Sequence, residues 1–206
     1  MATFSDNFNR ANGGLGSDWT TNTVAPVIYS NVATGSSGGG VDTGASCQKV
    51  STTDHYAQAV WLAGATHHYY QLGVRGSVYN ALIAGVSATC YHVEAWVPGD
   101  NETTLYRASI SGWVSLGMVD CTGYGAGTTY RLEIVGSTLR LLGNGTQIGS
   151  VTNTVVTTGT WTGWKVEIAT ANAAALDDWE CGDIGGTAVS LPPERSIRKY
   201  VPLLVR

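Results

Sequence analysis

The sequence has few charged residues, little proline and no long apolar run. Charged side chains make up 13% of its 206 residues, about half the usual share. No stretch reaches the roughly 20 apolar residues that a membrane-spanning helix needs. The first ten residues, MATFSDNFNR, lack the basic region and apolar core of a secretory signal. We therefore expect no membrane partner, and a chain that either stays in the cytoplasm where it is made or leaves it by lysis or within a particle.

Cysteine is also scarce, and its four copies are spread singly along the chain. None belongs to a C-x-x-C pair, which argues against a zinc site. Four cysteines allow three disulfide pairings, and the sequence does not choose among them. Without a signal peptide we expect reduced, partly buried thiols.

Negative charge exceeds positive charge, and the two are unevenly placed. Residues 1–190 hold seven basic and 14 acidic side chains, a net charge of −7. Residues 191–206 hold four basic side chains and one acidic, a net charge of +3. An acidic body argues against a nucleic-acid partner.

The clearest positive signal is the β pattern of residues 129–151, TYRLEIVGSTLRLLGNGTQIGSV. Leu132 and Ile134 alternate with Arg131 and Glu133, the period of two that marks a strand with one buried side. A second apolar run follows, and an Asn-Gly pair then turns the chain into a third, since both residues tolerate positive φ.

The same alternation recurs along most of the chain, separated by Gly-rich turns, and no window shows helical periodicity. The 34–40 segment, TGSSGGG, is expected to be a loop. We predict an all-β fold with two antiparallel sheets packed face to face, formed by one domain over residues 1–190. Besides the three strands above, the predicted strands span residues 4–8, 56–62, 68–74, 78–86, 91–97, 103–110, 113–119, 164–168 and 175–181.

Three stretches of the chain form a recognisable set: DNFNRANGGLGSDWT at 6–20, the 129–151 hairpin and ALDDWECGD at 175–183. They resemble the concanavalin A-like lectin/glucanase jelly roll in its laminin-G-like branch, including domains of phage virion proteins. The resemblance implies a jelly-roll β-sandwich whose first and last strands are neighbours, with Phe8 and Trp179 in one core region. It says less about function, because this architecture hosts lectins, hydrolases, adhesion modules and capsid parts.

The resemblance also implies a cation site. Related jelly rolls often hold a structural calcium near the edge where the end strands meet, and oxygen ligands suit that hard cation. The candidates are Asp6, Asn7 and Asp178, with Asp177 nearby. The alternative is that these side chains are solvated or cap turns.

Catalytic signals are weak. Glucanases with a similar fold carry their carboxylates as E-x-D-x-x-E, a string this chain lacks, and Glu94 has no acidic partner at that spacing. There is no G-x-S-x-G elbow, and no histidine lies in a motif that would set up a triad. We therefore expect that the protein is not an enzyme.

Aromatic composition favours carbohydrate binding instead. The chain has seven Trp and ten Tyr but two Phe, a bias toward rings with a polar group. Such rings stack on sugar faces when half-exposed. The candidate glycan-binding residues are Trp96, Asn101, Tyr106 and Tyr124, and core or rim packing is the alternative explanation.

The last residues, LPPERSIRKYVPLLVR at 191–206, form a basic and apolar tail after a Pro-Pro pair that ends the final strand. Because a peptide this apolar is rarely left exposed to water, we expect it to dock on a neighbouring subunit, for example by adding a strand to an exposed sheet edge. Folding back on its own domain is the alternative. The docking residues are predicted to be Ile197, Tyr200, Val201, Leu203 and Leu204.

Taken together, these features favour a non-enzymatic virion structural or decoration protein. Its lectin-like body would be anchored through the tail to other subunits of a homo-oligomeric assembly, and adhesion to host cell-surface glycans is a further hypothesis. The first alternative is a free carbohydrate-binding lectin. The second is a degenerate glycoside hydrolase.

Overall fold

A computed structural model of the chain describes residues 1–21, 24–36, 41–62, 69–78, 88–96, 102–109, 111–168 and 175–185. Within these ranges the chain forms sixteen strands and no helix, which confirms the all-β prediction. Accordingly, the described residues contain no helix long and apolar enough to cross a membrane.

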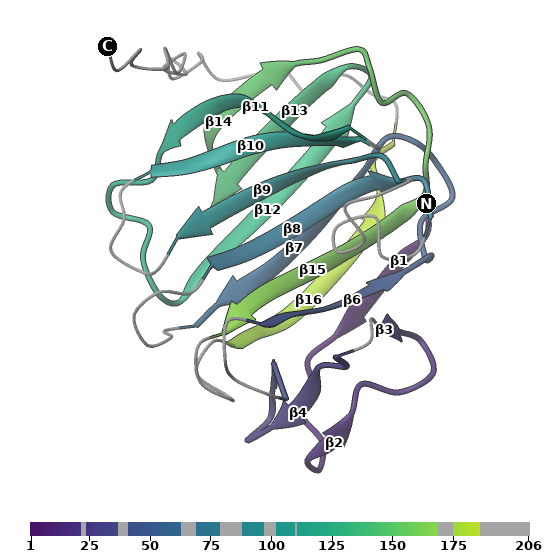
Figure 1. The fold of residues 1–206 in the computed structure, drawn as a ribbon, viewed down its shortest axis with the longest axis vertical. Helices are drawn as coiled ribbons and strands as arrows, with labels where there is room; N and C mark the ends of the chain where they lie inside the picture. The colour runs from purple at the N-terminus through teal and green to yellow at the C-terminus, as the bar shows by residue number, and fades with distance from the viewer. Residues whose placement is uncertain are drawn as a thin grey trace.

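The strands form two antiparallel sheets stacked face to face, with the seven-stranded sheet in front of the nine-stranded one in Figure 1. In spatial order the nine-stranded sheet contains β14 (Thr146–Thr152), β13 (Thr138–Gly143), β12 (Thr128–Val135), β7 (His55–Trp61), β16 (Ala175–Asp183), β5 (Val32–Thr34), β4 (Val27–Tyr29) and β2 (Gly13–Gly14), and β1 (Thr3–Asp6) also pairs with β16. The order of the seven-stranded sheet is β11 (Gly112–Asp120), β10 (Glu102–Ser109), β9 (Cys90–Trp96), β8 (Tyr69–Gly76), β15 (Trp161–Ile168), β6 (Val41–Cys47) and β3 (Thr20–Thr21).

The core lies between the sheets and is built from alternate residues of each strand. Leu132 and Ile134 of β12 face Leu72 and Val74 of β8, and all four side chains are fully buried. Burial of each such side chain contributes about 1.5–3 kcal/mol to folding. The sandwich is therefore held together by apolar contacts between layers, as the period of two predicts.

The hairpin of residues 129–151 is confirmed. Strands β12 and β13 pair from Tyr130 with Gly143 to Val135 with Thr138, and β13 pairs onward with β14. The turn between β13 and β14 uses Asn144 and Gly145, whose φ angles are 48° and 78°. An Asn-Gly pair fits this turn because neither residue is strongly disfavoured there.

The first and last strands are neighbours, as expected. Thr3 to Asp6 of β1 pair with Gly182 to Trp179 of β16. Trp19 lies between Phe8 and Trp179, with ring centroids 6.0 and 5.4 Å away, so these rings share one core region.

The predicted strands from 56–62 to 113–119 match β7 to β11 within two residues, except for the one predicted at 78–86. Residues 79–87 lie outside the described residues, as do 37–40 and the 186–206 segment that holds the tail. Two predictions differ from the structure. The first strand ends at Asp6 because Phe8 adopts a φ of 52°, and β6 was not expected.

Candidate functional site

The outer side of the seven-stranded sheet carries an unusual set of side chains. In β8 and β9 every second residue enters the core, and the residues between them point away from it. Many of these outward side chains are polar or charged and yet nearly inaccessible to water. We call this set the polar–aromatic face; it comprises Asp42, Tyr69, Gln71, His92, Glu94, Tyr106, Trp113 and Lys165.

Strand register fixes which of these residues are neighbours. Gln71 pairs with Lys165 of β15 on one side and with Glu94 of β9 on the other. Two residues before Glu94 in β9, His92 pairs with Tyr106 of β10. Antiparallel pairing places such side chains directly beside one another on the same side of the sheet.

A short hydrogen bond joins two of the buried polar groups. Gln71 Nε2 donates to Glu94 Oε2 over 2.5 Å, and both side chains are at most 5% exposed. The amide oxygen of Gln71 is buried as well, and no described residue donates a hydrogen bond to it. An unsatisfied buried acceptor costs about 1–3 kcal/mol, so this atom is an unusual feature of the face.

His92 is the most isolated polar group of the face. Its side chain is fully buried, and within the described part of the chain neither ring nitrogen has a hydrogen-bond partner. The ring stacks on Tyr106 with centroids 5.2 Å apart and packs edge-to-face with Trp113, with centroids 4.7 Å apart. Burial lowers the pKa of His92 to about 3, so the imidazole is neutral at physiological pH.

Lys165 supplies the positive charge on this face. Its ammonium group donates to Asp42 over 2.9 Å and to the Tyr69 hydroxyl over 3.4 Å. The same group lies 5.1 and 5.0 Å from the ring centroids of Tyr69 and Trp113, within the range of cation–π attraction. Only 1% of Lys165 is exposed, so the ion pair fixes its position.

The arrangement suits a neutral ligand rich in hydroxyl groups. A neutral imidazole offers one N–H donor and one nitrogen acceptor, and the Gln71 oxygen adds another acceptor. Trp113, on edge strand β11, is 38% exposed and presents a ring beside these groups. An apolar ring next to convergent polar atoms is the usual composition of a carbohydrate site.

The sequence-predicted glycan residues are only partly brought together. Tyr106 lies on the polar–aromatic face, while Asn101 and the side chain of Trp96 lie outside the described residues. Tyr124 follows β11 and packs against the core, in contact with Gly143 of β13. Gln71 and His92 were not selected from the sequence, although polar residues at every second position of β8 and β9 were a usable signal.

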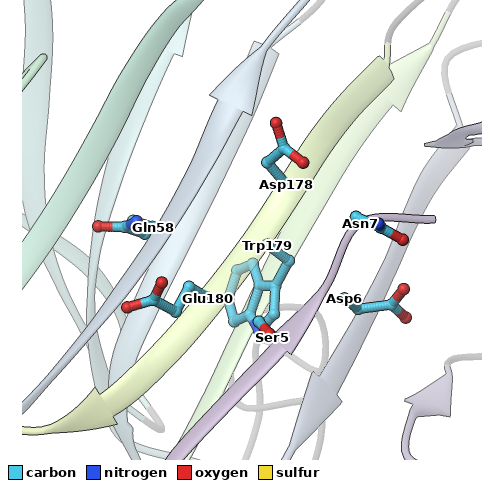
Figure 2. A pocket seen from close by; sticks show the side chains of 7 residues that line it. All are labelled: Ser5, Asp6, Asn7, Gln58, Asp178, Trp179 and Glu180. Atoms are coloured by element: carbon cyan, nitrogen blue, oxygen red, sulfur yellow. The ribbon is translucent and has the colours of Figure 1, made fainter. Parts of the chain in front are cut away.

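A second candidate is a polar groove of about 450 Å³ that runs across β1, β16 and β7 of the nine-stranded sheet. Figure 2 shows the side chains of β16, of β7 and of the β1 end around it. Strand pairing places Ser5, Glu180 and Gln58 in one row across the sheet. Asp178 lies at a bulge of β16 with a φ of 48°. The full lining is Ser5, Asp6, Asn7, Gln58, Asp178, Trp179 and Glu180.

This groove brings together the three residues predicted to bind calcium, but Asp6 does not fit that role. Both of its oxygens accept hydrogen bonds from Arg10, over 2.6 and 3.0 Å, and Trp19 Nε1 donates over 2.9 Å. Burial alone would raise the pKa of Asp6, but the bonds from Arg10 and Trp19 outweigh it and lower that pKa. A guanidinium therefore already neutralises this carboxylate.

No cluster of three or more His, Cys, Asp or Glu side chains in the described ranges could hold a metal ion. Asn7 Oδ1 accepts a hydrogen bond from the Asn9 amide, while Asp178 lies exposed at the groove. Calcium at Asn7 and Asp178 stays a prediction.

No protein-family model matches the chain, and no curated protein matches it in sequence. Solved structures do. The carbohydrate-binding module CBM66 from Bacillus subtilis has a TM-score of 0.54 and 11% identity, covering 82% of this chain and 98% of its own. The Bacillus licheniformis β-glucanase has a TM-score of 0.59 and 11% identity, covering 88% and 97%. The Crh5 transglycosylase in complex with NAG has a TM-score of 0.62 and 8% identity, covering 90% and 85%.

These likenesses establish a jelly-roll sandwich of the concanavalin A-like and galectin-like kind. At such low identity they show the fold alone. Because the similar structures include binding modules as well as glucanases, the fold does not decide between binding and catalysis.

Proposed function

We propose that this chain is a non-enzymatic, lectin-like protein that binds a neutral glycan on its polar–aromatic face. The observation that carries the proposal is the pairing of unsatisfied polar atoms with an exposed ring. The buried nitrogens of His92 and the oxygen of Gln71 have no partner among the described residues, and Trp113 presents its ring beside His92. A sugar hydroxyl both donates and accepts, so it can satisfy such atoms once the side chains that bury them move aside, while the ring stacks on the pyranose.

Binding is favoured over hydrolysis by the state of the carboxylates. On the part of the face whose side chains are described, Asp42 is paired with Lys165, and Glu94 accepts a hydrogen bond from Gln71. Glycoside hydrolysis needs one carboxyl group as an acid and a second as a base or nucleophile. A degenerate hydrolase remains the rival, since β-glucanases are among the similar structures.

A glycan array followed by titration calorimetry tests the proposal. The wild-type protein is expected to bind selected neutral glycans, and Trp113→Ala is expected to weaken that binding at least about tenfold. Tyr29→Ala is the matched control, because Tyr29 is 47% exposed on β4 of the other sheet. Equal losses in both variants, or no binding by the wild-type protein, would contradict the proposal. Release of reducing sugar from a bound glycan would favour the hydrolase.

The proposal extends to a role as a virion structural or decoration protein that displays this face on a particle. It is supported by the resemblance of residues 6–20 to the opening of phage virion domains and by the basic, apolar composition of 191–206. The tail would dock on another subunit. Particle incorporation is expected to fail when residues 191–206 are removed, while glycan binding by the body persists. Unchanged assembly would favour a free lectin instead.

A further inference from the structure

Two cysteines from opposite sheets meet in the core of the sandwich. Cys47 is the last residue of β6 in the seven-stranded sheet, and Cys181 lies in β16 of the nine-stranded sheet. Their sulfur atoms are 3.8 Å apart, and the side chains are 1% and 0% exposed. Sulfur atoms at this separation are in direct contact, although 134 residues separate them in sequence.

The other two cysteines occupy different places. Cys90 packs with Ala88 and Ala108 in a cluster apart from the main core. Cys121 directly follows β11, and β10, β9, β8 and β15 lie between that strand and β6 in the order of the sheet. The structure therefore distinguishes among the three pairings that the sequence leaves open.

We propose that Cys47 and Cys181 are an oxidation site, at which a peroxide converts the two thiols into a disulfide that links the sheets. In the first step one thiol loses its proton, the thiolate attacks an oxygen of hydrogen peroxide, and the O–O bond breaks; a sulfenic acid forms, and the departing hydroxide takes up the released proton to become water. The second thiol then attacks the sulfenic sulfur, forms the S–S bond and expels a second water. Two thiols are oxidised and one peroxide is reduced to two water molecules.

The contact between the thiols favours the loss of one proton from the pair, because the pair holds one negative charge far more readily than two. Thr162 Oγ1 lies 3.4 Å from the Cys47 sulfur. Either sulfur can therefore be the nucleophile, and the other resolves the sulfenic acid.

Closing the bond requires a modest movement. The sulfur atoms must approach from 3.8 Å to about 2.05 Å, which rotation about the side-chain bonds and a small shift of the facing strands can supply. Other β-sandwich domains join their two sheets in this way, with a tryptophan packed against the disulfide. Here Trp179 is two residues from Cys181 on the same, core-facing side of β16.

The cross-link would close a long loop and so reduce the conformational freedom of the unfolded chain. It would also fix β6 to β16. Oxidation is therefore expected to raise the thermal midpoint, by about 5 °C or more for a chain of this size.

Peroxide treatment of the full-length reduced protein tests the site. After treatment the protein is denatured, free thiols are blocked with N-ethylmaleimide, and peptides are mapped by mass spectrometry without reduction. The expected product is one monomer with a Cys47–Cys181 linked peptide that has lost two hydrogen atoms, with Cys90 and Cys121 blocked. Dithiothreitol should restore both thiols and the original thermal midpoint.

Two variants complete the test. Cys47→Ala should abolish the linked peptide and the rise in midpoint, while Cys90→Ala should retain both. If Cys47→Ala does not fold, the peptide map of the wild-type protein decides alone. Blocked thiols at both Cys47 and Cys181 after treatment, a disulfide to any other cysteine, or a stable sulfinic acid at either position would overturn the proposal.

Discussion

His92 and Tyr106 are direct partners across β9 and β10, and their rings are stacked with planes 17° from parallel. Such stacking holds the imidazole in one orientation and excludes water from its faces. The Trp113 ring packs edge-to-face with the imidazole. A neutral histidine enclosed by two aromatic rings is therefore the centre of the polar–aromatic face.

This enclosure predicts a pH dependence of stability. Burial lowers the folded pKa of His92 to about 3 from 6.5, so the unfolded chain binds a proton that the folded chain does not. Stability therefore falls as pH drops below about 6.5, at up to roughly 1.4 kcal/mol per pH unit. In urea unfolding, the wild-type protein should lose about 2–3 kcal/mol more between pH 7 and 4.5 than His92→Leu does.

For each protein, the free energy of unfolding at pH 4.5 is compared with its own value at pH 7. Any pH-independent loss of stability caused by the substitution therefore cancels. His55 is also buried, and burial lowers its pKa, so His92→Leu should retain part of the slope. An identical slope in both proteins would show that His92 is protonated in the folded state.

Asp183 is predicted to be a major structural carboxylate. It accepts hydrogen bonds from the amide and hydroxyl groups of Ser51 and Thr52 and from the amide of Ala2. Asp183→Asn removes the charge and one acceptor oxygen, and should cost about 2–4 kcal/mol in the free energy of unfolding at pH 7. The control Asp18→Asn breaks an exposed pair with Lys49 and should cost under about 1 kcal/mol.

The effect of Asp183 should also depend on pH. Burial would raise its pKa, but the bonds from Ser51, Ala2 and Thr52 outweigh burial and lower it well below 3.8. Its contribution is thus present above pH 3.8 and is lost as pH falls toward the folded pKa. The difference in the free energy of unfolding between wild type and Asp183→Asn should become smaller below about pH 3.8. A difference that stays constant with pH would contradict this account.

Calcium should not stabilise the protein through Asp6. Because Arg10 and Trp19 already occupy that carboxylate, Asp6→Asn should leave any difference in thermal midpoint between EDTA and millimolar calcium unchanged to within about 1 °C. Asp6→Asn should nevertheless cost about 1–3 kcal/mol, since it removes the ion pair with Arg10. A calcium-dependent rise of several degrees that Asp178→Asn abolishes would instead establish a site in the groove of Figure 2.

Gly143 is predicted to be essential for the packing of Tyr124. A Cβ atom at this position would overlap the Tyr124 ring, so Gly143→Ala should cost about 1–3 kcal/mol by overpacking. Gly125→Ala is the matched control, because a Cβ there meets nothing within 4 Å. Glycan binding should survive in any folded Gly143→Ala protein, and its loss would place Tyr124 in the binding site.

The strands that could be predicted from sequence are those with large apolar residues at every second position. In the 129–151 hairpin, Leu132, Ile134, Leu139 and Leu141 mark the buried side, and all four are fully buried. Strand β6, VDTGASC, has small side chains on both sides, so its pattern carries no hydrophobic signal. Its pairing with β15 and β3 is set by tertiary contacts.

The candidate site was harder to predict, because it depends on strand order. Tyr106 was selected for its residue type, but its neighbours Gln71 and His92 come from β8 and β9 and are identified only by register. The sequence likewise placed Asp6 and Asp178 at one edge. It could not show that Arg10, four residues after Asp6, would take the carboxylate predicted to bind calcium.

The position of β16 determines how the sandwich would carry mechanical load. Residues 179–182 pair with β1 on one side, and β7 flanks the strand on the other. Just beyond, the Asp183 amide donates to Ala2 and the Ile184 amide to Asp54. A pull on the residues that follow would stress these ladders lengthwise, so many hydrogen bonds would have to shear together instead of peeling open one by one. A domain tethered through the residues after β16 would thus resist unfolding when a ligand bound elsewhere on its surface is pulled.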